Sequence, residues 1–183
     1  MEFEIVFHGP MRVATGTAAP GADATVDPDA LLPAASLKGL MRDTARQLFA
    51  DDDVAAVFGG GGQPSPWSWC SARFEPEAPP VTRRARIRRD ERGVTDRGAL
   101  LVQEEVWPER ATFEIEQVLP VPREGLERQR LVLTAAAHAV HALGADRRRG
   151  LGWVGVARTD ASPDDIARAV ELALEALNEG GVR

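Results

Sequence analysis

The sequence predicts an α+β domain in which helices cover one face of an antiparallel sheet. Its 183 residues, 44% of them hydrophobic, are enough to build one domain with a substantial core. Short segments of alternating polarity are separated by longer segments whose apolar residues recur at helical spacing. No apolar run approaches the ~20 residues that a membrane span needs, so we expect no membrane partner.

The N-terminal sequence and the single cysteine favour a reducing, cytoplasmic location. Residues 1–7 carry acidic side chains where a signal peptide would carry basic ones. Cys70 has no second cysteine with which to form a disulfide or a cysteine-cluster zinc site.

The first third of the sequence predicts a strand, a long loop and a helix. Residues 2–8 alternate between apolar and polar positions, as in a strand with one buried face. Residues 9–35 are rich in Gly, Pro, Ala and Asp and show no period, which predicts a long loop. Ser36 is a candidate helix N-cap, and a largely apolar stripe follows it: Leu37, Leu40, Met41, Thr44 and Leu48.

The middle of the chain predicts a second strand and a protruding hairpin. Residues 67–74 form the strand, and the Pro-rich residues 75–80 end it. Residues 81–112 contain two extended pieces around a turn-like tetrad at 90–93, which predicts a hairpin insertion with an arginine-dense first arm. A further strand is expected over residues 113–118.

The last third predicts a helix over residues 126–143, with Gly144 just beyond its end, a strand over 153–157, and a final helix opened by Ser162. Without the hairpin and the last helix, the order is β-α-β-β-α-β, the ferredoxin-like (RRM-like) layout. We expect residues 1–183 to form one domain. Because this layout hosts many functions, it indicates none by itself.

The formal net charge of −6 argues at first against a nucleic-acid binder, since polyanions are held mainly by Lys and Arg. The basic residues are unevenly placed, however. Lys38 is the only lysine, seven arginines fall between Arg83 and Arg97, and three more are consecutive at residues 147–149. The placement of the arginines is therefore more informative than the net charge.

Several individual features have both a structural and a functional interpretation. Lys38, Arg42 and Arg46 share one helix face, which is either a solvated face or a basic row beside a helix N-terminus that favours phosphate. The glycines at 59–62 lack the Gly-Lys-Ser/Thr ending of a nucleotide-binding loop and favour a linker.

Aromatic and histidine side chains are open to the same two interpretations. Trp67, Trp69 and Trp107 are candidates for base stacking, although burial in the core is the default for tryptophan. His138 and His141 are three residues apart on the predicted helix. With no third ligand nearby in the sequence, a packing or surface role is preferred to metal binding.

Three segments together carry a family resemblance. They are Leu32-Pro-Ala-Ala-Ser-Leu-Lys-Gly-Leu-Met-Arg, the loop Gly144-Ala-Asp-Arg-Arg-Arg-Gly-Leu-Gly, and Arg86-Ile-Arg-Arg-Asp to Glu104-Glu-Val-Trp-Pro with Thr112-Phe-Glu. In combination they resemble the RAMP (repeat-associated mysterious protein) superfamily of CRISPR systems, and most of all the repeated backbone subunit of type III effector complexes. The resemblance spans roughly residues 3–157.

The resemblance implies a subunit that polymerises along a CRISPR guide RNA and contacts target RNA, copies of itself and other effector subunits. The hairpin over 81–112 would be its thumb, with Val94, Leu100 and Leu101 as candidates for displacing a nucleotide. Arginine forks and close glycine backbone suit contacts to phosphate rather than to bases. The expected RNA-binding residues are Ser36, Lys38, Gly39, Arg42, Arg86, Arg88, Arg147, Arg148, Arg149, Gly150 and Gly152.

In target-cleaving members of this family, an aspartate in the loop before the helix start supports metal-dependent cutting of the paired RNA. Asp23 occupies the place that resembles it most, and Asp27 is the alternative. A carboxylate there would hold Mg²⁺ or a similar divalent cation. The structural interpretation of either residue is an Asx turn in a Gly/Pro loop.

Three other functions compete with this hypothesis. The chain is a non-catalytic guide-RNA scaffold, or a RAMP-type RNA-processing endonuclease that uses His8, or, remotely, a small-molecule enzyme that uses the glycines at 59–62.

Overall fold

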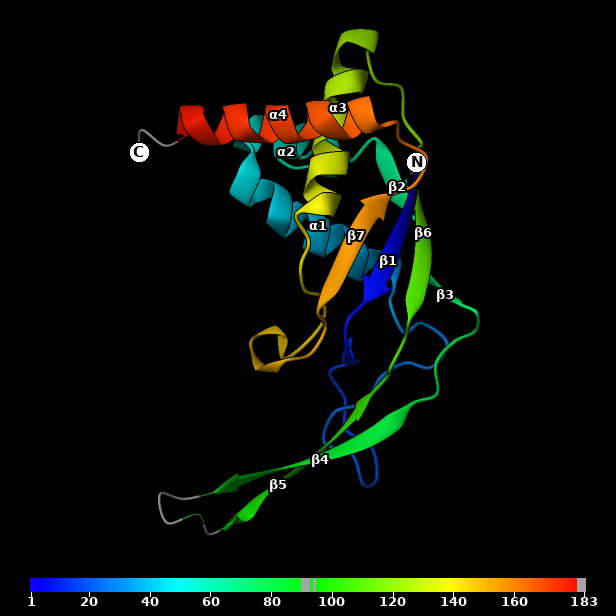
Figure 1. The fold of residues 1–183 in the computed structure, drawn as a ribbon, viewed down its shortest axis with the longest axis vertical. Coiled ribbons are helices and arrows are strands. Elements are labelled where there is room, and N and C mark those ends of the chain that lie inside the picture. The colour runs from blue at the N-terminus through cyan, green and yellow to red at the C-terminus, as the bar shows by residue number, and fades with distance from the viewer. Residues whose placement is uncertain (90–92, 94, 181–183) are drawn as a thin grey trace.

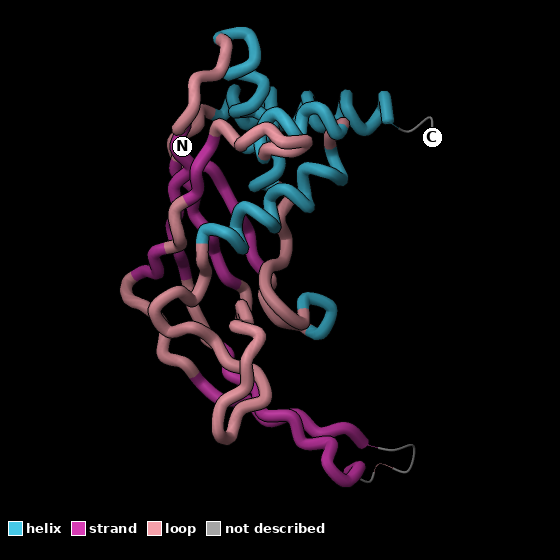
Figure 2. Tube along the Cα trace, turned by 180° about the vertical axis from the view of Figure 1, so that it is seen from behind, coloured by secondary structure: helices cyan, strands magenta, loops and turns pink. Residues whose placement is uncertain are grey.

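The computed structural model describes residues 1–89, 93 and 95–180, and in it helices cover one face of an antiparallel sheet (Figures 1 and 2). In spatial order the strands of this sheet are β2 (Trp67–Trp69), β6 (Arg110–Gln117), β1 (Glu2–Phe7) and β7 (Val154–Arg158), with β3 (Arg73–Glu75) also paired to β6. Every pair is antiparallel. The predicted ferredoxin-like layout is confirmed.

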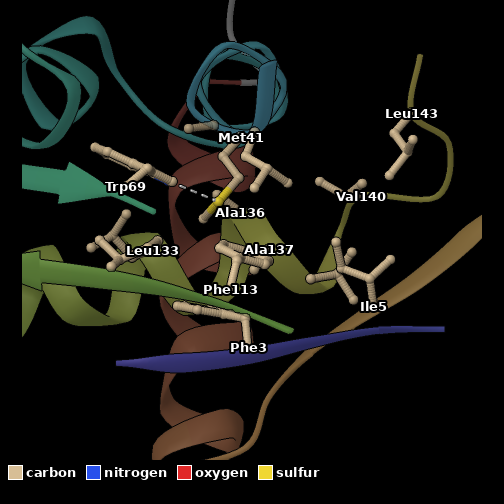
Figure 3. Close-up of a cluster of buried hydrophobic side chains, with 14 of the residues drawn as sticks. Phe3, Ile5, Met41, Trp69, Phe113, Leu133, Ala136, Ala137, Val140 and Leu143 are labelled. Atoms are coloured by element: carbon tan, nitrogen blue, oxygen red, sulfur yellow. Dashed lines mark hydrogen bonds between the residues drawn. The ribbon is translucent and has the colours of Figure 1, made fainter. Parts of the chain in front are cut away.

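The helical layer closes the apolar face of the sheet. It consists of α1 (Ala34–Leu48), α2 (Asp51–Phe58), α3 (Arg123–His138) and α4 (Pro163–Gly180). Phe3 of β1 and Phe113 of β6 stack at a centroid distance of 5.0 Å beneath α1 and α3, and Met41 accepts a hydrogen bond from the Trp69 indole (Figure 3). The alternation of β1 therefore buries Phe3 and Ile5 as expected.

Helix boundaries in α1 and α3 differ from the sequence prediction. The first helix begins at Ala34 with Pro33 as its N-cap, so Ser36 lies inside the first turn and makes no cap hydrogen bond. Proline needs no hydrogen-bond partner for its nitrogen, so it is tolerated at a helix start. The helix predicted over 126–143 instead ends at His138, and the buried Val140 and Leu143 lie in the connection that follows.

The acidic run after Ala50 forms a helix that the sequence prediction did not include. Asp51, Asp52 and Asp53 fill the first turn of α2, where the helix dipole favours negative charge. At the start of α4, Ser162 opens the helix as expected, and it forms a reciprocal cap with Asp165, because each backbone N–H donates to the other residue's side chain. None of the helices in the described parts of the chain is long and apolar enough to cross a membrane.

The hairpin predicted within 81–112 is β4 (Thr82–Arg89) paired with β5 (Thr95–Glu105), which extends away from the sheet and is called the thumb below (Figure 1). The loop over 9–33 is partly ordered against its base. Met11 pairs with Val106, and Ala24 makes a parallel bridge with Gln103 of β5. The base of the thumb is thus built from segments that are distant in sequence.

Candidate nucleic-acid interface

The loop over residues 144–152, called the arginine loop below, is anchored at both ends by glycines. Gly144 has a φ of 78° and Gly152 a φ of 73°, a left-handed conformation that glycine adopts without strain. A Cβ on Gly144 would overlap the carbonyl oxygen of Arg12, and one on Gly152 would overlap that of Leu143. The sequence Gly-x₇-Gly is therefore required by close backbone packing at both positions.

Between these anchors the loop presents its arginines to solvent. Residues 147–149 form a single 3₁₀ turn, and all three of their side chains are exposed, as is Gly150. Gly152 is buried and donates its N–H to the Pro10 carbonyl at 2.7 Å. The RNA contact expected of Gly152 would therefore be indirect, through the shape of the loop, whereas Arg147, Arg148, Arg149 and Gly150 are accessible.

Asp146 joins the arginine loop to the thumb and to the segment after β1. Its Oδ2 lies 2.6 Å from Nη2 of Arg12 and 3.1 Å from Nη1 of Arg86 on β4. Asp146 also has a positive φ of 57°, uncommon for a residue other than glycine. One carboxylate thus fixes the predicted site residue Arg86 beside the arginine loop.

Arg12 was missed by the sequence analysis, although it is the most buried charged residue in the described parts of the chain. It is 3% exposed, and its Nε and Nη1 have no hydrogen-bond partner there. Burying a charge is costly unless it is paired, so Arg12 depends strongly on Asp146. A basic residue between Met11 and Val13, in the predicted loop shortly after the strand over 2–8, was the available signal.

The predicted residues at the start of α1 form a second basic patch. Lys38 lies with its Nζ 5.0 Å from the ring centroid of Trp69, a cation–π contact. Partial burial lowers the pKa of the Lys38 ammonium, and the positive charge of Arg42 lowers it further. Gly39 is exposed and Ser36 half-buried. An anion at this patch would relieve the unfavourable charge on Lys38.

Arg42 extends from α1 toward the glycine run. Its Nη2 is 3.7 Å from where a Cβ on Gly60 would lie, and its buried Nε has no described hydrogen-bond partner. The described contacts join this α1 patch to β2 and the glycine run, whereas the arginine loop contacts the thumb. Figure 2 shows the start of α1 and the 3₁₀ turn separated from each other. The structure therefore presents two basic patches rather than a single continuous one.

The thumb carries apolar side chains exposed to solvent. Leu100 is 59% and Leu101 37% exposed, and Ile87, directly opposite Leu100, is 48% exposed. Ile87 was not among the predicted wedge residues because it lies within a run of arginines. The side chain of Arg88 and the whole of Val94, both predicted earlier, lie outside the described residues.

Asp23 lies at the base of the thumb. Its Oδ2 accepts a hydrogen bond from the Val102 N–H at 2.7 Å, and its own N–H donates to the Val102 carbonyl at 2.7 Å. The residue is exposed, and Oδ1 has no described partner. Asp27 instead accepts a hydrogen bond from the Asp29 N–H at 3.0 Å, which is the Asx turn considered for this loop.

Asp23 alone does not make a preformed metal centre. The described residues contain no group of three His, Cys, Asp or Glu side chains that is able to hold a metal ion. One exposed carboxylate nevertheless suits Mg²⁺, which is commonly held by one or two carboxylates together with substrate phosphates and water. Asp23 fits such an ion only if RNA supplies the remaining ligands.

The tryptophans and histidines separate into core and surface groups. Trp67 and Trp69 are buried, whereas Trp107 is 58% exposed. Trp153, which was not singled out as a stacking candidate, is 60% exposed. His138 accepts a hydrogen bond from the Arg158 N–H, in line with the preferred packing role.

Comparisons with known proteins agree with this fold. A chain of the type III-B Cmr-beta complex in the apo state matches with a TM-score of 0.66 and 14% identity, over 87% of this chain and 96% of that chain. A chain of Cmr-beta bound to cognate target RNA matches with a TM-score of 0.65 and 14% identity, over 85% and 95% of the two chains. A search of curated proteins found no match. The model of the RAMP superfamily matches residues 4–155, so this chain belongs to the RAMP superfamily.

Proposed function

We propose that this chain is a guide-RNA-binding backbone subunit of a type III CRISPR effector complex. Membership in the RAMP superfamily and the fold shared with chains of the Cmr-beta complexes support this assignment. One of those complexes is bound to target RNA, which supports target RNA and other effector subunits as partners of this chain as well.

The observation that carries the proposal is the pair of salt bridges that Asp146 forms with Arg12 and with Arg86 of the thumb. By holding Arg86 of the thumb at 3.1 Å, Asp146 places the first thumb arm beside the three exposed arginines of the loop. Arginine guanidinium groups match phosphate oxygens in fork geometry and carry no information about base identity. Such a surface suits a protein that holds guides of any sequence.

Repetition along one RNA strand resolves the conflict between the net charge of −6 and RNA binding. A single subunit offers the arginine loop and the α1 patch as two local contacts, and copies on the same strand add their contacts with a high effective concentration. Between neighbouring copies, the exposed pair Ile87 and Leu100 on the thumb is suited to displace a base.

The test measures RNA affinity across a series of salt concentrations. Replacing Arg147, Arg148 and Arg149 together by alanine is expected to reduce the slope of log affinity against log salt by about 2 for a single strand. The control replaces Arg123, Arg130 and Arg168, exposed arginines of α3 and α4, and has the same net charge. An equal loss in both variants would contradict the proposal.

A second function, cleavage of the paired target RNA, is favoured by the position of Asp23 between the RNA-facing thumb and the solvent. Mg²⁺, when bound, would supply a Lewis acid at the scissile phosphate. In this proposal Asp23 contributes one oxygen to the ion, while the hydrogen bond from Val102 fixes the orientation of its carboxylate.

Cleavage is tested in the assembled complex with guide and target RNA. Asp23→Ala and Asp23→Asn are both expected to lower Mg²⁺-dependent cutting by roughly 100-fold or more, because neither retains the charge. Asn keeps an oxygen that can accept from Val102, so it separates charge from loop structure. Asp29→Ala is the control. If the complex with Asp23→Asn cuts target RNA normally, the proposed catalytic role of Asp23 is wrong, and the chain is better described as a non-catalytic scaffold.

A further inference from the structure

The charge of the helix-free face of the sheet changes along its strands. In the register of β1, Glu2 lies opposite Glu114, Glu4 opposite Thr112, and Val6 opposite Arg110. The acidic end is thus near the start of β1, and Arg110, with a side chain 62% exposed, lies toward the thumb. At the thumb end Arg110 lies opposite Glu75 of β3 and Val6 of β1, so this end carries fewer acidic side chains than the start of β1.

Trp153 lies at that thumb end and points away from the core. Val154 and Val156 are buried in the helical layer, so by strand alternation Trp153 and Gly155 lie on the helix-free face. The His8 N–H donates to the Trp153 carbonyl at 2.8 Å, which extends the β1–β7 pairing beyond Phe7. The indole is 60% exposed.

The neighbours of Trp153 leave one side of the indole accessible. Gly155, two residues along the same face, has no side chain, and a Cβ there would lie 3.7 Å from Nε2 of His8. His8 is itself exposed. Trp153, beside the His8 imidazole and Gly155, therefore has an accessible aromatic face. The indoles of Trp67 and Trp69, in contrast, are buried and hydrogen-bonded.

The arginine loop, whose three exposed arginines are suited to phosphate, directly precedes Trp153 in the chain. Gly152, which precedes Trp153, ends the arginine loop, and its anchoring to Pro10 fixes where β7 begins. Arginines beside an exposed aromatic side chain are the combination with which proteins bind single-stranded nucleic acid, by phosphate contact and base stacking. An apolar protein surface would leave the three adjacent positive charges at 147–149 without partners, whereas an RNA strand pairs with them.

We propose that Trp153 stacks on a base of the single-stranded RNA whose phosphates the arginine loop holds, with His8 beside the indole. This inference rests on the proposed function and deepens it, since it adds a base contact to a backbone-binding loop. Stacking on an aromatic ring does not depend on base identity, so the contact is compatible with any guide sequence.

The test uses the full chain and a single-stranded oligouridine of about 12 nucleotides, which spans one such site. Trp153→Leu retains an apolar side chain without a stacking surface and is expected to weaken binding by roughly 5- to 150-fold. Trp153→Phe retains a ring and is expected to bind within a few-fold of the unmodified chain. Equal affinity of all three proteins overturns the inference.

Fluorescence gives a second measurement that does not depend on affinity. In a Trp107→Phe background, Trp153 is the single exposed tryptophan, and we expect oligouridine to quench its emission at saturation. Absence of quenching while the RNA is bound overturns the stacking contact.

The two proposals fail in different ways. If the Arg147–Arg149 variant shows the reduced salt dependence but Trp153→Leu binds normally, only the stacking inference is wrong. If the unmodified chain binds neither the oligouridine nor a long single strand that holds several copies at low salt, both are wrong. If Trp153→Leu binds oligouridine normally but loses effector subunits from the assembled complex, the surface is a protein contact and the inference is overturned.

Discussion

In the body of the protein, aromatic and aliphatic side chains fill the space between the sheet and α1 and α3, and Phe3 and Phe113 are at most 2% exposed. At the base of the thumb, by contrast, charged and polar residues are buried beside apolar ones such as Met11 and Val106; they are Arg12, Gln103 and Glu105. The body is therefore stabilised by non-directional burial, whereas the thumb base depends on specific partners. The difference predicts that the thumb base can be disturbed without unfolding the body.

The largest effect is expected from a cavity in the body. Phe113→Ala removes a buried ring that stacks on Phe3, and is expected to lower the free energy of unfolding by about 3 to 5 kcal/mol. Denaturant unfolding followed by circular dichroism measures it. A loss below about 1 kcal/mol would mean that the body is not the stabilising region.

A smaller but more local effect is expected in the arginine loop. Gly152→Ala combines an unfavourable positive φ with overlap onto the Leu143 carbonyl and should cost roughly 2 to 4 kcal/mol. Gly150→Ala is the matched control, because Gly150 has a similar φ of 84° but no atoms close to the added Cβ. It should cost about 1 to 2 kcal/mol. Equal losses in the two variants would contradict the close packing under Gly152.

Removing the Asp146 carboxylate tests whether the thumb base depends on its ion pairs. Asp146→Asn leaves the buried Arg12 guanidinium without its negative partner, which should cost about 1 to 3 kcal/mol. Arg86→Ala, which leaves the Arg12–Asp146 pair intact, should cost less. Hydrogen exchange is expected to increase in β4 and the loop for Asp146→Asn while β1 and β6 stay protected. An equal loss of protection in all of these elements would show that the thumb base and the body unfold as one cooperative unit.

The smallest effect concerns a histidine at the edge of the body. Burial lowers the pKa of His138 below its ordinary 6.5, so the folded state favours the neutral imidazole that accepts from the Arg158 N–H. The contribution of His138 to the free energy of unfolding is fully present above pH 6.5. It decreases as the pH falls from 6.5 toward the lower pKa of the folded state. His138→Gln should remove this part of the pH dependence. Parallel unfolding curves for both proteins between pH 7 and 5 would show that His138 does not contribute.

The fold was predictable from sequence because its signals are local. Alternation in residues 2–8 and the stripe of α1 each report burial of one face, and β1 and α1 bury those faces as expected. Helix ends were less predictable, since Val140 and Leu143 continue the apolar pattern after α3 has ended. Burial in a connecting segment gives the same sequence signal as burial in a helix.

Of the candidate interface, the sequence indicated the exposed arginines and the basic residues at the start of α1. The Arg12–Asp146 pair joins residues 134 positions apart, and no local pattern encodes it. Trp153 was recognised as the start of a strand, but its exposure depends on which face of β7 meets the helices. Contacts between distant segments, and the direction in which a side chain points, therefore required the three-dimensional structure.

The bridge between Ala24 and Gln103 bears on aggregation, because it lies at an edge of the thumb hairpin. With the hydrogen bond from the Asp23 N–H to the Val102 carbonyl, it covers the outer edge of β5 near the body, whereas the outer edge of β4 has no strand partner in the described parts of the chain. That remaining edge bears Arg83, Arg84 and Arg86, and two such edges brought together would repel each other. The guanidinium groups to which the proposed function assigns RNA contacts would thereby also discourage edge-to-edge association between copies of the chain.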